Sequence, residues 1–127
     1  MECTQKFFIC QTCGNMVGLI CDEGPPLMCC GEEMDELVPN TVEASVEKHI
    51  PVVSVSGDSI SVQVGSVQHP MEDGHHIQFV YVETENGGQR KCLKVAATPN
   101  VAFCFADDKP VAVYAYCNLH GLWKAEV

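Results

Sequence analysis

Hydrophobic and polar residues alternate with a period of two along most of the chain after residue 39, as they do in half-buried β-strands. Gly, Asn, Asp and Pro interrupt this alternation at intervals of eight to twelve residues, where they predict turns. No stretch has the pattern of a convincing amphipathic helix. We therefore expect a small antiparallel β-sandwich of about seven short strands, at residues 41–46, 52–56, 60–64, 77–83, 90–95, 101–105 and 111–117.

Residues 1–38 lack this alternation and are rich in Cys, Gly and Met. Pro39 ends any element that precedes it, and Pro39-Asn40 is a typical turn sequence. We therefore divide the chain into a small domain at 1–38 and a larger domain at 39–127. A domain of fewer than about 40 residues usually needs a metal or disulfides to fold, because its hydrophobic core is too small.

Four cysteines of the small domain form two pairs. Cys10 and Cys13 have the spacing C-x-x-C, whereas Cys29 and Cys30 are adjacent. Four thiolates form a closed tetrahedral site that suits zinc or iron. A glycine follows each pair and allows a tight backbone turn there. The alternative is a disulfide framework, and the adjacent pair also departs from the two C-x-x-C knuckles that zinc ribbons generally have.

The cysteines and the N-terminal residues together indicate a reducing compartment. Nine cysteines are present, but the first ten residues lack the charged and apolar regions of a secretory signal. Clustered thiols in a reducing compartment bind metals rather than pair, so we expect a cytoplasmic location. We expect no membrane span, because no run of about 18 apolar residues is present. Cys92 and Cys104 are expected to be small core residues, and Cys3 and Cys21 are left as spare thiols.

The formal net charge of the chain is −10, with only seven Lys and Arg residues. Nucleic acid is therefore not expected as a partner, because contacts with phosphates require these side chains. The acidity also sets a condition on function. An anionic substrate would need local positive charge near its site to overcome the overall field of the protein.

A second set of possible metal ligands lies in the larger domain. Cys117 and His120 are spaced C-x-x-H, which lets a thiolate and an imidazole from one turn reach the same ion. Each further histidine alone would more often be a hydrogen-bonded surface or core residue. Beside the C-x-x-H, however, one thiolate and up to four neutral imidazoles suit iron with an open position for a small ligand. The further imidazoles are those of His49, His69, and either His75 or His76.

Together these motifs resemble the desulfoferrodoxin family, the two-iron superoxide reductases, over nearly the whole chain and in the same order. The resemblance implies a rubredoxin- or desulforedoxin-like metal knuckle followed by an immunoglobulin-like antiparallel β-sandwich, and it implies a homodimer. One iron would be bound in a four-cysteine centre by Cys10, Cys13, Cys29 and Cys30. A second iron would be bound by four imidazoles and one thiolate, from His49, His69, His75, His120 and Cys117.

The family pattern places one of these imidazoles at His75 and leaves the neighbouring His76 without a role. Strand alternation also favours His75, because it would share a face of the strand with Ile77 and Phe79. The alternative ligand is His76, which would compete for the same ion.

The reaction implied by the resemblance is the one-electron reduction of superoxide, which takes up two protons and yields hydrogen peroxide. Cys117 would be the axial ligand, opposite an open position for superoxide. Lys48 would supply the local positive charge, and Glu47 would be a sixth ligand of the resting ferric ion. The backbone N–H of Asn118 would donate to the Cys117 sulfur. The electron would come from a donor protein such as rubredoxin.

Two other functions remain open from the sequence. The chain could be a non-enzymatic electron-transfer protein, with a rubredoxin-like domain joined to a β-sandwich adaptor. It could also be a zinc-dependent structural module. Both leave the histidines without a role, and metal analysis separates them from the enzyme, because only the enzyme requires two irons per chain.

Overall fold

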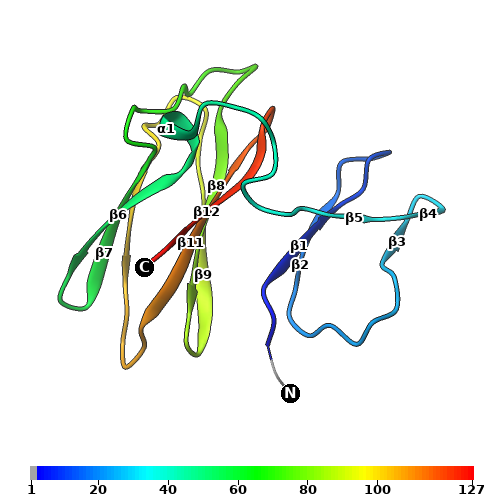
Figure 1. The fold of residues 1–127 in the computed structure, drawn as a ribbon, viewed down its shortest axis with the longest axis horizontal. Coiled ribbons are helices and arrows are strands. Elements are labelled where there is room, and N and C mark those ends of the chain that lie inside the picture. The colour runs from blue at the N-terminus through cyan, green and yellow to red at the C-terminus, as the bar shows by residue number, and fades with distance from the viewer. Residues whose placement is uncertain (1–2) are drawn as a thin grey trace. The chain divides into compact units, whose positions relative to one another are not determined.

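The computed structural model describes residues 3–127, and its regular structure is almost entirely β. The chain divides into two compact units between Val38 and Pro39, called here the small unit (3–38) and the large unit (39–127). Figure 1 shows the strands of both units. The one helix of the described residues is the single turn α1 (Val46–His49), and no helix among them is long and apolar enough to cross a membrane.

The small unit contains five short strands among its described residues. They are β1 (Lys6–Ile9), β2 (Met16–Leu19), β3 (Met28–Cys29), β4 (Glu32–Glu33) and β5 (Asp35–Glu36). β1 lies between β2 and β5 in one antiparallel sheet, and β3 pairs with β4. Only Phe7, Cys10 and Met34 are buried apolar residues among those described, so the core of this unit is small. The sequence pattern did not predict these strands, because runs of two to four residues are too short to show alternation.

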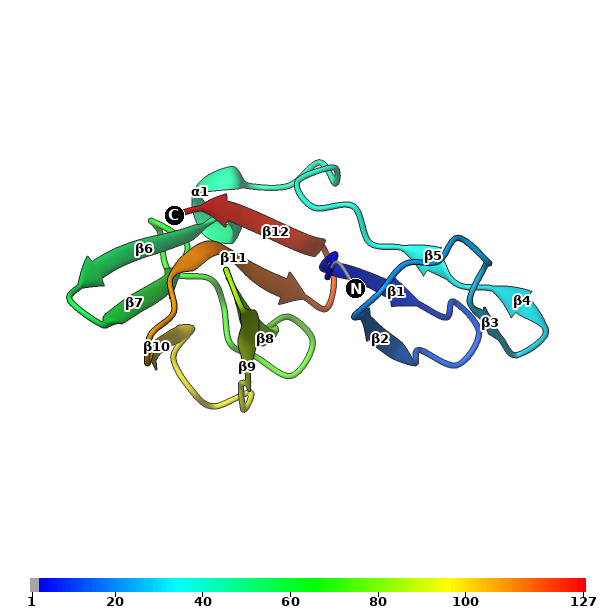
Figure 2. The ribbon, with the colours of Figure 1, turned by 90° about the horizontal axis from the view of Figure 1, so that it is seen from below.

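The large unit is a sandwich of two antiparallel sheets, which confirms the predicted fold class. Its seven strands are β6 (Pro51–Ser56), β7 (Ser59–Val64), β8 (Ile77–Thr84), β9 (Gly87–Cys92), β10 (Asn100–Cys104), β11 (Pro110–Cys117) and β12 (Gly121–Glu126). One sheet has the order β10-β7-β6, and the other has the order β12-β11-β8-β9. Figure 2 shows the β6–β7 hairpin and the β11–β12 hairpin in separate layers.

Two elements of the large unit differ from the prediction. Residues 41–46, predicted as a strand, pair with no other strand, and the chain there leads into α1 instead. Val42 and Val46, which suggested alternation, are 44% and 55% exposed. Strand β12 was not predicted. Gly121, with a φ of +81°, closes a tight hairpin so that β12 returns directly along β11, and Gly121 pairs with Cys117.

Alternate residues of β7, β8 and β11 fill the core between the sheets. The core cluster comprises Ile60, Val62, Val64, Ile77, Val80, Val82, Phe103, Phe105, Val113, Ala115 and Cys117. Cys117 is the last residue of β11 and is fully buried, so the core ends at a thiol. The C-x-x-H motif therefore occupies the hairpin loop at one end of the sandwich.

Strand β8 contains an irregularity beside this loop. Cys117 pairs with Ile77 and Tyr116 pairs with Phe79, which leaves Gln78 as an extra residue in β8. Ile77 consequently belongs to the core cluster, whereas Phe79 stacks on Tyr116 with ring centroids 5.7 Å apart. The expectation that Ile77 and Phe79 share one face is therefore wrong, because a bulge shifts the alternation.

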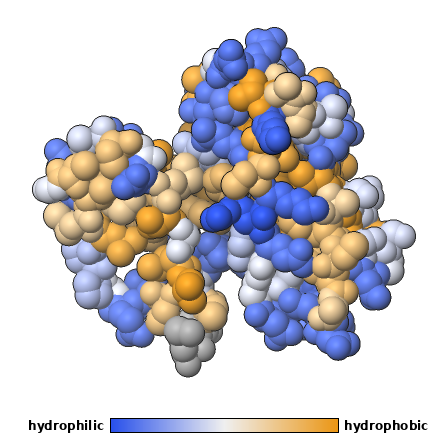
Figure 3. Space-filling view, turned by 180° about the vertical axis from the view of Figure 1, so that it is seen from behind, coloured by the Kyte–Doolittle hydropathy of each residue, from blue (hydrophilic) through white to orange (hydrophobic). Residues whose placement is uncertain are grey.

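The expectation that Cys92 and Cys104 are core residues is also wrong, because both are exposed. They lie on β9 and β10, the edge strands of the two sheets. Side chains of β9 bond to the backbone of β10 here. Lys91 Nζ lies 2.5 Å from the Ala102 carbonyl, and Gln89 donates to the Cys104 carbonyl over 2.8 Å. Figure 3 shows the large unit from the side opposite to Figure 1. Hydrophilic residues predominate on this face, with hydrophobic residues between them.

Candidate metal centres

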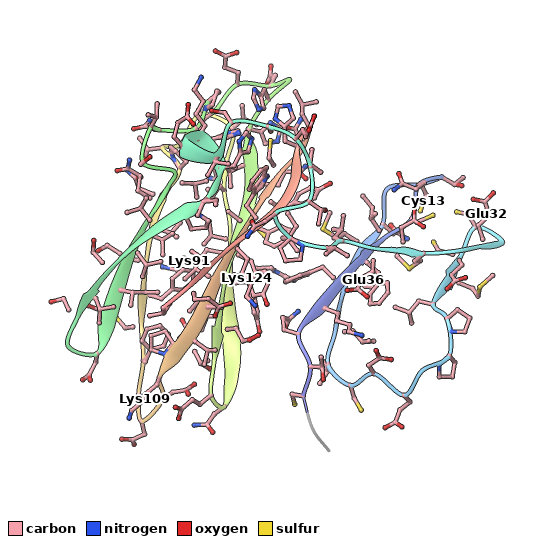
Figure 4. The ribbon with its side chains drawn as sticks, viewed as in Figure 1. Cys13, Glu32, Glu36, Lys91, Lys109 and Lys124 are labelled. Carbon is pink, nitrogen blue, oxygen red and sulfur yellow. The ribbon has the colours of Figure 1, made fainter. Side chains whose placement is uncertain are left out.

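The four cysteines predicted as one site lie together in the small unit. Their sulfur atoms are within 4.8 Å of one another, and Figure 4 shows sulfur atoms gathered beside Cys13. The sulfurs of Cys13 and Cys29 are 3.6 Å apart, and those of Cys29 and Cys30 are 4.0 Å apart. Tetrahedral ligands about 2.3 Å from a metal ion lie about 3.8 Å from one another. The separations therefore fit four ligands of a single ion.

Tight backbone turns bring these sulfurs together. Gly14 and Gly31, which follow the two cysteine pairs, have φ values of +83° and +77°. Gly14 N–H donates to the Cys10 carbonyl over 2.9 Å, and Asn15 N–H donates to the Cys13 sulfur over 3.4 Å. A side chain at either glycine would meet the steric penalty of the left-handed region. The glycines thus allow backbone N–H groups to approach the sulfurs.

The thiols of this group lie within hydrogen-bonding distance of one another. The backbone N–H of Cys13 lowers the pKa of the Cys10 thiol to about 7. Hydrogen bonds with the side chains of Cys13, Cys10 and Cys29 raise the pKa of the Cys30 thiol to about 12. One sulfur thus ionises readily while another keeps its proton. A bound cation would be needed to ionise all four sulfurs at neutral pH.

The second group forms where several segments of the large unit meet. His49 ends α1, His69 lies in the loop after β7, His75 lies just before β8, and Cys117 ends β11. The ligand atoms of these four residues are within 4.8 Å of one another. His120 lies in the β11–β12 loop, with its Nδ1 atom 3.2 Å from Nε2 of His49 and 3.9 Å from the Cys117 sulfur. Figure 4 shows the nitrogen atoms of this end of the sandwich beside α1.

The four imidazole rings surround one point. Nε2 of His49 lies 3.2 Å from Nε2 of His69, the same separation as from Nδ1 of His120. Successive rings around the point are nearly perpendicular, at 73° for His49 and His69, 82° for His69 and His75, 79° for His75 and His120, and 89° for His120 and His49. Nitrogens held at right angles about 2.1 Å from a metal ion would be about 3.0 Å apart. The two measured nitrogen separations fit this arrangement.

Backbone carbonyls orient two of the imidazoles. Nδ1 of His49 lies 2.7 Å from the Ser45 carbonyl, and Nδ1 of His69 lies 2.7 Å from the Pro70 carbonyl. A carbonyl only accepts, so each Nδ1 carries the proton and each Nε2 lone pair faces the common point. Nε2 of His75 is buried there without a hydrogen-bond partner. An orphaned buried nitrogen of this kind is what a metal ligand leaves when no ion is present.

Burial sets the protonation of this group before any metal is bound. It lowers the pKa values of His49 and His75, and it lowers the pKa of His69 to about 4, so these three imidazoles are neutral at pH 7. Burial raises the pKa of the Cys117 thiol, and the backbone N–H groups of Leu119 and His120 partly oppose that rise. Neutral imidazoles are ready to bind a metal, whereas the thiol must lose its proton to do so.

Comparison with known proteins identifies the family. The family described as desulfoferrodoxin matches residues 41–126 of the chain. A desulfoferrodoxin from Syntrophotalea carbinolica is 42% identical over 121 residues, which are 95% of each chain. A superoxide reductase from Pyrococcus horikoshii is 37% identical over 100 residues, covering 64% of this chain and 86% of its own. The crystal structure of the superoxide reductase from Treponema pallidum aligns with 99% of this chain and 100% of its own, at 35% identity and a TM-score of 0.83. The chain belongs to the desulfoferrodoxin family. Its two groups of cysteine and histidine side chains fit the two iron centres of that family.

In this member of the desulfoferrodoxin family, the structure brings His75 rather than His76 into the ligand group. The His76 ring lies outside it, with Nδ1 2.9 Å from the Glu72 carbonyl. The sequence argument from strand alternation did not supply the reason, because β8 begins only at Ile77 and is bulged. The choice between the two histidines depends on how the loop between Glu72 and His75 closes on itself.

The expected hydrogen bond from Asn118 to the thiolate sulfur is not formed. Asn118 N–H donates instead to the His76 carbonyl over 3.1 Å. The backbone N–H groups that face the Cys117 sulfur are those of Leu119 and His120. The hairpin loop turns after Asn118, so the amides of the next two residues point back to the sulfur, and the first amide points to the adjacent loop.

Glu47 and Lys48 lie on the turn of α1 that ends at His49, and both side chains are exposed. A hydrogen bond from its own backbone N–H, then one from Ser45, lowers the pKa of the Glu47 carboxyl. The Glu47 carbonyl accepts from Val67 N–H over 2.8 Å and from the Ser66 hydroxyl over 3.2 Å. These bonds fix the backbone of the turn and leave the two charged side chains in solvent.

Two residues that position the site were not assigned a role from the sequence. Trp123 stacks on the His49 ring, with centroids 4.9 Å apart, and its Nε1–H donates to the His120 carbonyl over 3.1 Å. A Cβ atom at Gly65 would lie 2.5 Å from the Glu47 carbonyl oxygen, so only glycine lets the end of β7 approach α1 this closely. A lone glycine next to a strand can indicate such an approach, but the sequence does not reveal its partner.

Proposed function

We propose that this chain is a superoxide reductase, which reduces superoxide with one electron and two protons to hydrogen peroxide. The observation that carries the proposal is the set of four imidazoles around one point with the buried Cys117 thiol beside them. Membership of the desulfoferrodoxin family and the likeness to the superoxide reductase from Treponema pallidum support it.

Each domain is proposed to hold one iron. Residues 1–38 form the domain of the four-cysteine centre, and residues 39–127 form the immunoglobulin-like reductase domain. The ligands of the first iron are Cys10, Cys13, Cys29 and Cys30. The ligands of the second iron are His49, His69, His75, His120 and Cys117. When bound at the second centre, iron would supply the single electron that superoxide accepts.

The protein side chains set the charge at this centre. Imidazole binds a metal in its neutral form and so leaves the charge of a bound cation undiminished, and the Cys117 thiolate would be the one anionic ligand among these five. Lys48, exposed next to His49, adds positive charge that attracts an anionic substrate. Glu47, exposed on the same turn, is proposed to bind the oxidised ion when no substrate is present.

The proposal that the chain is a superoxide reductase also indicates its partners and its location. The substrate is superoxide, the electron comes from a donor protein such as rubredoxin, and the chain forms a homodimer as the family resemblance implies. The cysteines support a cytoplasmic location. None of the described cysteines forms a disulfide, and four of them are arranged to bind a metal.

A non-enzymatic electron carrier is the alternative function, and metal content together with Cys117→Ser separates it from the enzyme. We expect two irons per chain and a thiolate-to-iron(III) absorption band beyond those of the four-cysteine centre. Cys117→Ser should abolish both this band and superoxide reduction, because an alcohol replaces the thiolate. Cys104→Ser, at an exposed thiol of β10, is the matched control and should retain both. A single iron per chain, or a Cys117→Ser variant that still reduces superoxide at the wild-type rate, would rule the proposal out.

The role of Lys48 is tested by pulse radiolysis at low and high salt. Lys48→Ala should lower the second-order rate constant for superoxide by about tenfold and flatten its salt dependence, since electrostatic attraction is screened by ions. Lys109→Ala removes the same charge from the exposed β10–β11 loop, away from α1 (Figure 4), and should change little. Glu47→Ala should capture superoxide normally but alter the spectrum of the resting ferric state. Equal rates in both lysine variants at low salt would remove Lys48 from the mechanism.

A further inference from the structure

Asn118 joins the end of β11 to the loop that carries His75. Its side-chain Oδ1 accepts from His76 N–H over 2.8 Å, and its Nδ2 donates to the Gly74 carbonyl over 3.1 Å. Its own backbone N–H donates to the His76 carbonyl over 3.1 Å. Three hydrogen bonds from one residue thus bracket His75 on both sides, and they start from the residue that follows Cys117.

The chemistry of the side chain suits these partners. One partner is a backbone N–H, which can only donate, and the other is a backbone carbonyl, which can only accept. The two partners fix which end of the Asn118 amide is oxygen and which is nitrogen, and both ends are satisfied. Aspartate has the same shape but no donor, so its carboxylate would face the Gly74 carbonyl without a proton between them.

His75 depends on such support more than two of its neighbours do. The His49 and His69 rings are each held by a hydrogen bond from Nδ1 to a backbone carbonyl. Nε2 of the His75 ring is instead buried without a hydrogen-bond partner among the described residues. The bonds between Glu72 and His75, 2.9 and 3.1 Å long, close the loop on itself but do not join it to another strand.

We propose that Asn118 is a positioning residue that holds the His75 imidazole toward the metal centre and keeps it in register with the Cys117 thiolate. Because Asn118 follows Cys117 directly, movement of the axial sulfur and of the His75 loop would be coupled through its side chain. The proposal rests on the metal centre of the proposed function, but it does not depend on the reaction carried out there.

The first test follows iron binding at the band that arises from Cys117. Asn118→Ala and Asn118→Asp should bind iron at this centre about 10 to 100 times more weakly than the wild type, as is typical when a residue supporting a ligand is lost. The thiolate-to-iron(III) band should also shift. Asn100→Ala, which truncates an exposed asparagine on β10, is the matched control and should behave as the wild type. Wild-type iron affinity in Asn118→Ala would overturn the proposal.

A double-mutant cycle asks whether Asn118 acts through His75. In a His75→Ala background, Asn118→Ala should weaken iron binding by no more than about twofold, because the residue that it positions is already missing. An equal loss in both backgrounds would show that Asn118 acts on Cys117 or on the fold in general, and would overturn the proposal.

A third readout needs no metal and covers the case in which the double variant does not bind iron. In the metal-free protein, hydrogen exchange of the His76 amide should be protected in the wild type and accelerated in Asn118→Ala, because this amide donates to the Asn118 side chain. Unchanged protection would overturn the proposal. Iron binding that depends on Asn118 in a chain that does not reduce superoxide would instead refute the proposed function alone.

Discussion

Gly65 lies against the backbone of the turn that carries His49, so Gly65→Ala should disturb the metal centre from outside. A Cβ atom at residue 65 would lie 2.5 Å from the Glu47 oxygen, 2.8 Å from the Lys48 carbonyl carbon and 3.0 Å from the His49 nitrogen. All three are backbone atoms and cannot rotate away as the end of a side chain can. Carbon atoms in ordinary contact are about 3.5–4.0 Å apart, so the turn would have to move by roughly 1 Å.

Movement of this size is large compared with the spacing inside the site. Nε2 of His49 is 3.2 Å from its nearest imidazole nitrogens. Overpacking of this kind typically costs about 1–3 kcal/mol of folding free energy. A catalytic group misplaced by about 1 Å can lose about 100-fold in rate. We expect Gly65→Ala to destabilise the metal-free large unit by about 1–3 kcal/mol and to slow superoxide reduction by roughly 10- to 100-fold.

Urea unfolding of the metal-free protein, followed by the fluorescence of the single Trp123, measures the loss of stability in the large unit. Pulse radiolysis of the iron-loaded protein measures the loss of rate. Gly74→Ala is the matched control. Gly74 lies in the His75 loop, but a Cβ atom there would have no heavy atom within 4 Å apart from those of its chain neighbours. If Gly65→Ala were as stable and as fast as Gly74→Ala, the close approach would have no structural consequence and the reasoning would be refuted.

Three further predictions concern other parts of the molecule. Cys13→Ser should lose the absorption of the four-cysteine centre and destabilise the small unit, yet keep most superoxide reduction. If activity were lost in parallel with that iron, in protein with an intact second centre, the four-cysteine centre would be an obligatory electron relay. In the metal-free protein, burial lowers the pKa of His69 from 6.5 to about 4, so the unfolded chain binds a proton first as the pH falls. Stability should therefore be full above pH 6.5 and fall by up to about 3 kcal/mol toward pH 4, measured by urea unfolding, and His69→Gln should remove this part of the pH dependence. Trp123→Phe keeps a ring against His49 but loses the 3.1 Å hydrogen bond to the His120 carbonyl. It should lower the free energy of unfolding in urea by about 1 kcal/mol and shift the thiolate-to-iron(III) band. An unchanged band would mean that the indole N–H does not orient His120.

Local spacing made the chemistry of the chain predictable. Cys10 and Cys13, or Cys117 and His120, are three residues apart, and a single turn of backbone suffices to bring such a pair to one ion. Six of the seven predicted strands, all but the one at residues 41–46, were found, because the alternation of a strand also depends on near neighbours. For these reasons the two metal centres and the sandwich could be predicted from the sequence together with the family resemblance.

The remaining features depend on contacts between segments that are far apart in the sequence. Gln78 becomes an extra residue only because of how β8 pairs with β11, and this pairing places Ile77 and Phe79 on different faces. Strand β12 (Gly121–Glu126) does not alternate, since the adjacent Leu122 and Trp123 are both buried, and it exists because Gly121 returns the chain along β11. The amide of Asn118 points to a loop more than 40 residues away, as the separation of 44 positions from Gly74 shows. Local patterns carry no information about these pairings.

The electrostatics of the large unit connect this fold to its proposed substrate. The core ends at the Cys117 thiol, and burial lowers the pKa values of His49, His69 and His75. Cys117 is the one residue of the five that would bind a divalent cation as an anion. The centre would therefore retain about one unit of positive charge, and the neighbouring turn adds one positive charge at Lys48 and one negative charge at Glu47. The whole chain carries a net charge of −10, so the overall field of the protein opposes the approach of a monoanion. One anionic ligand among five residues thus leaves local positive charge at the centre, which a strongly acidic protein needs in order to attract its proposed anionic substrate.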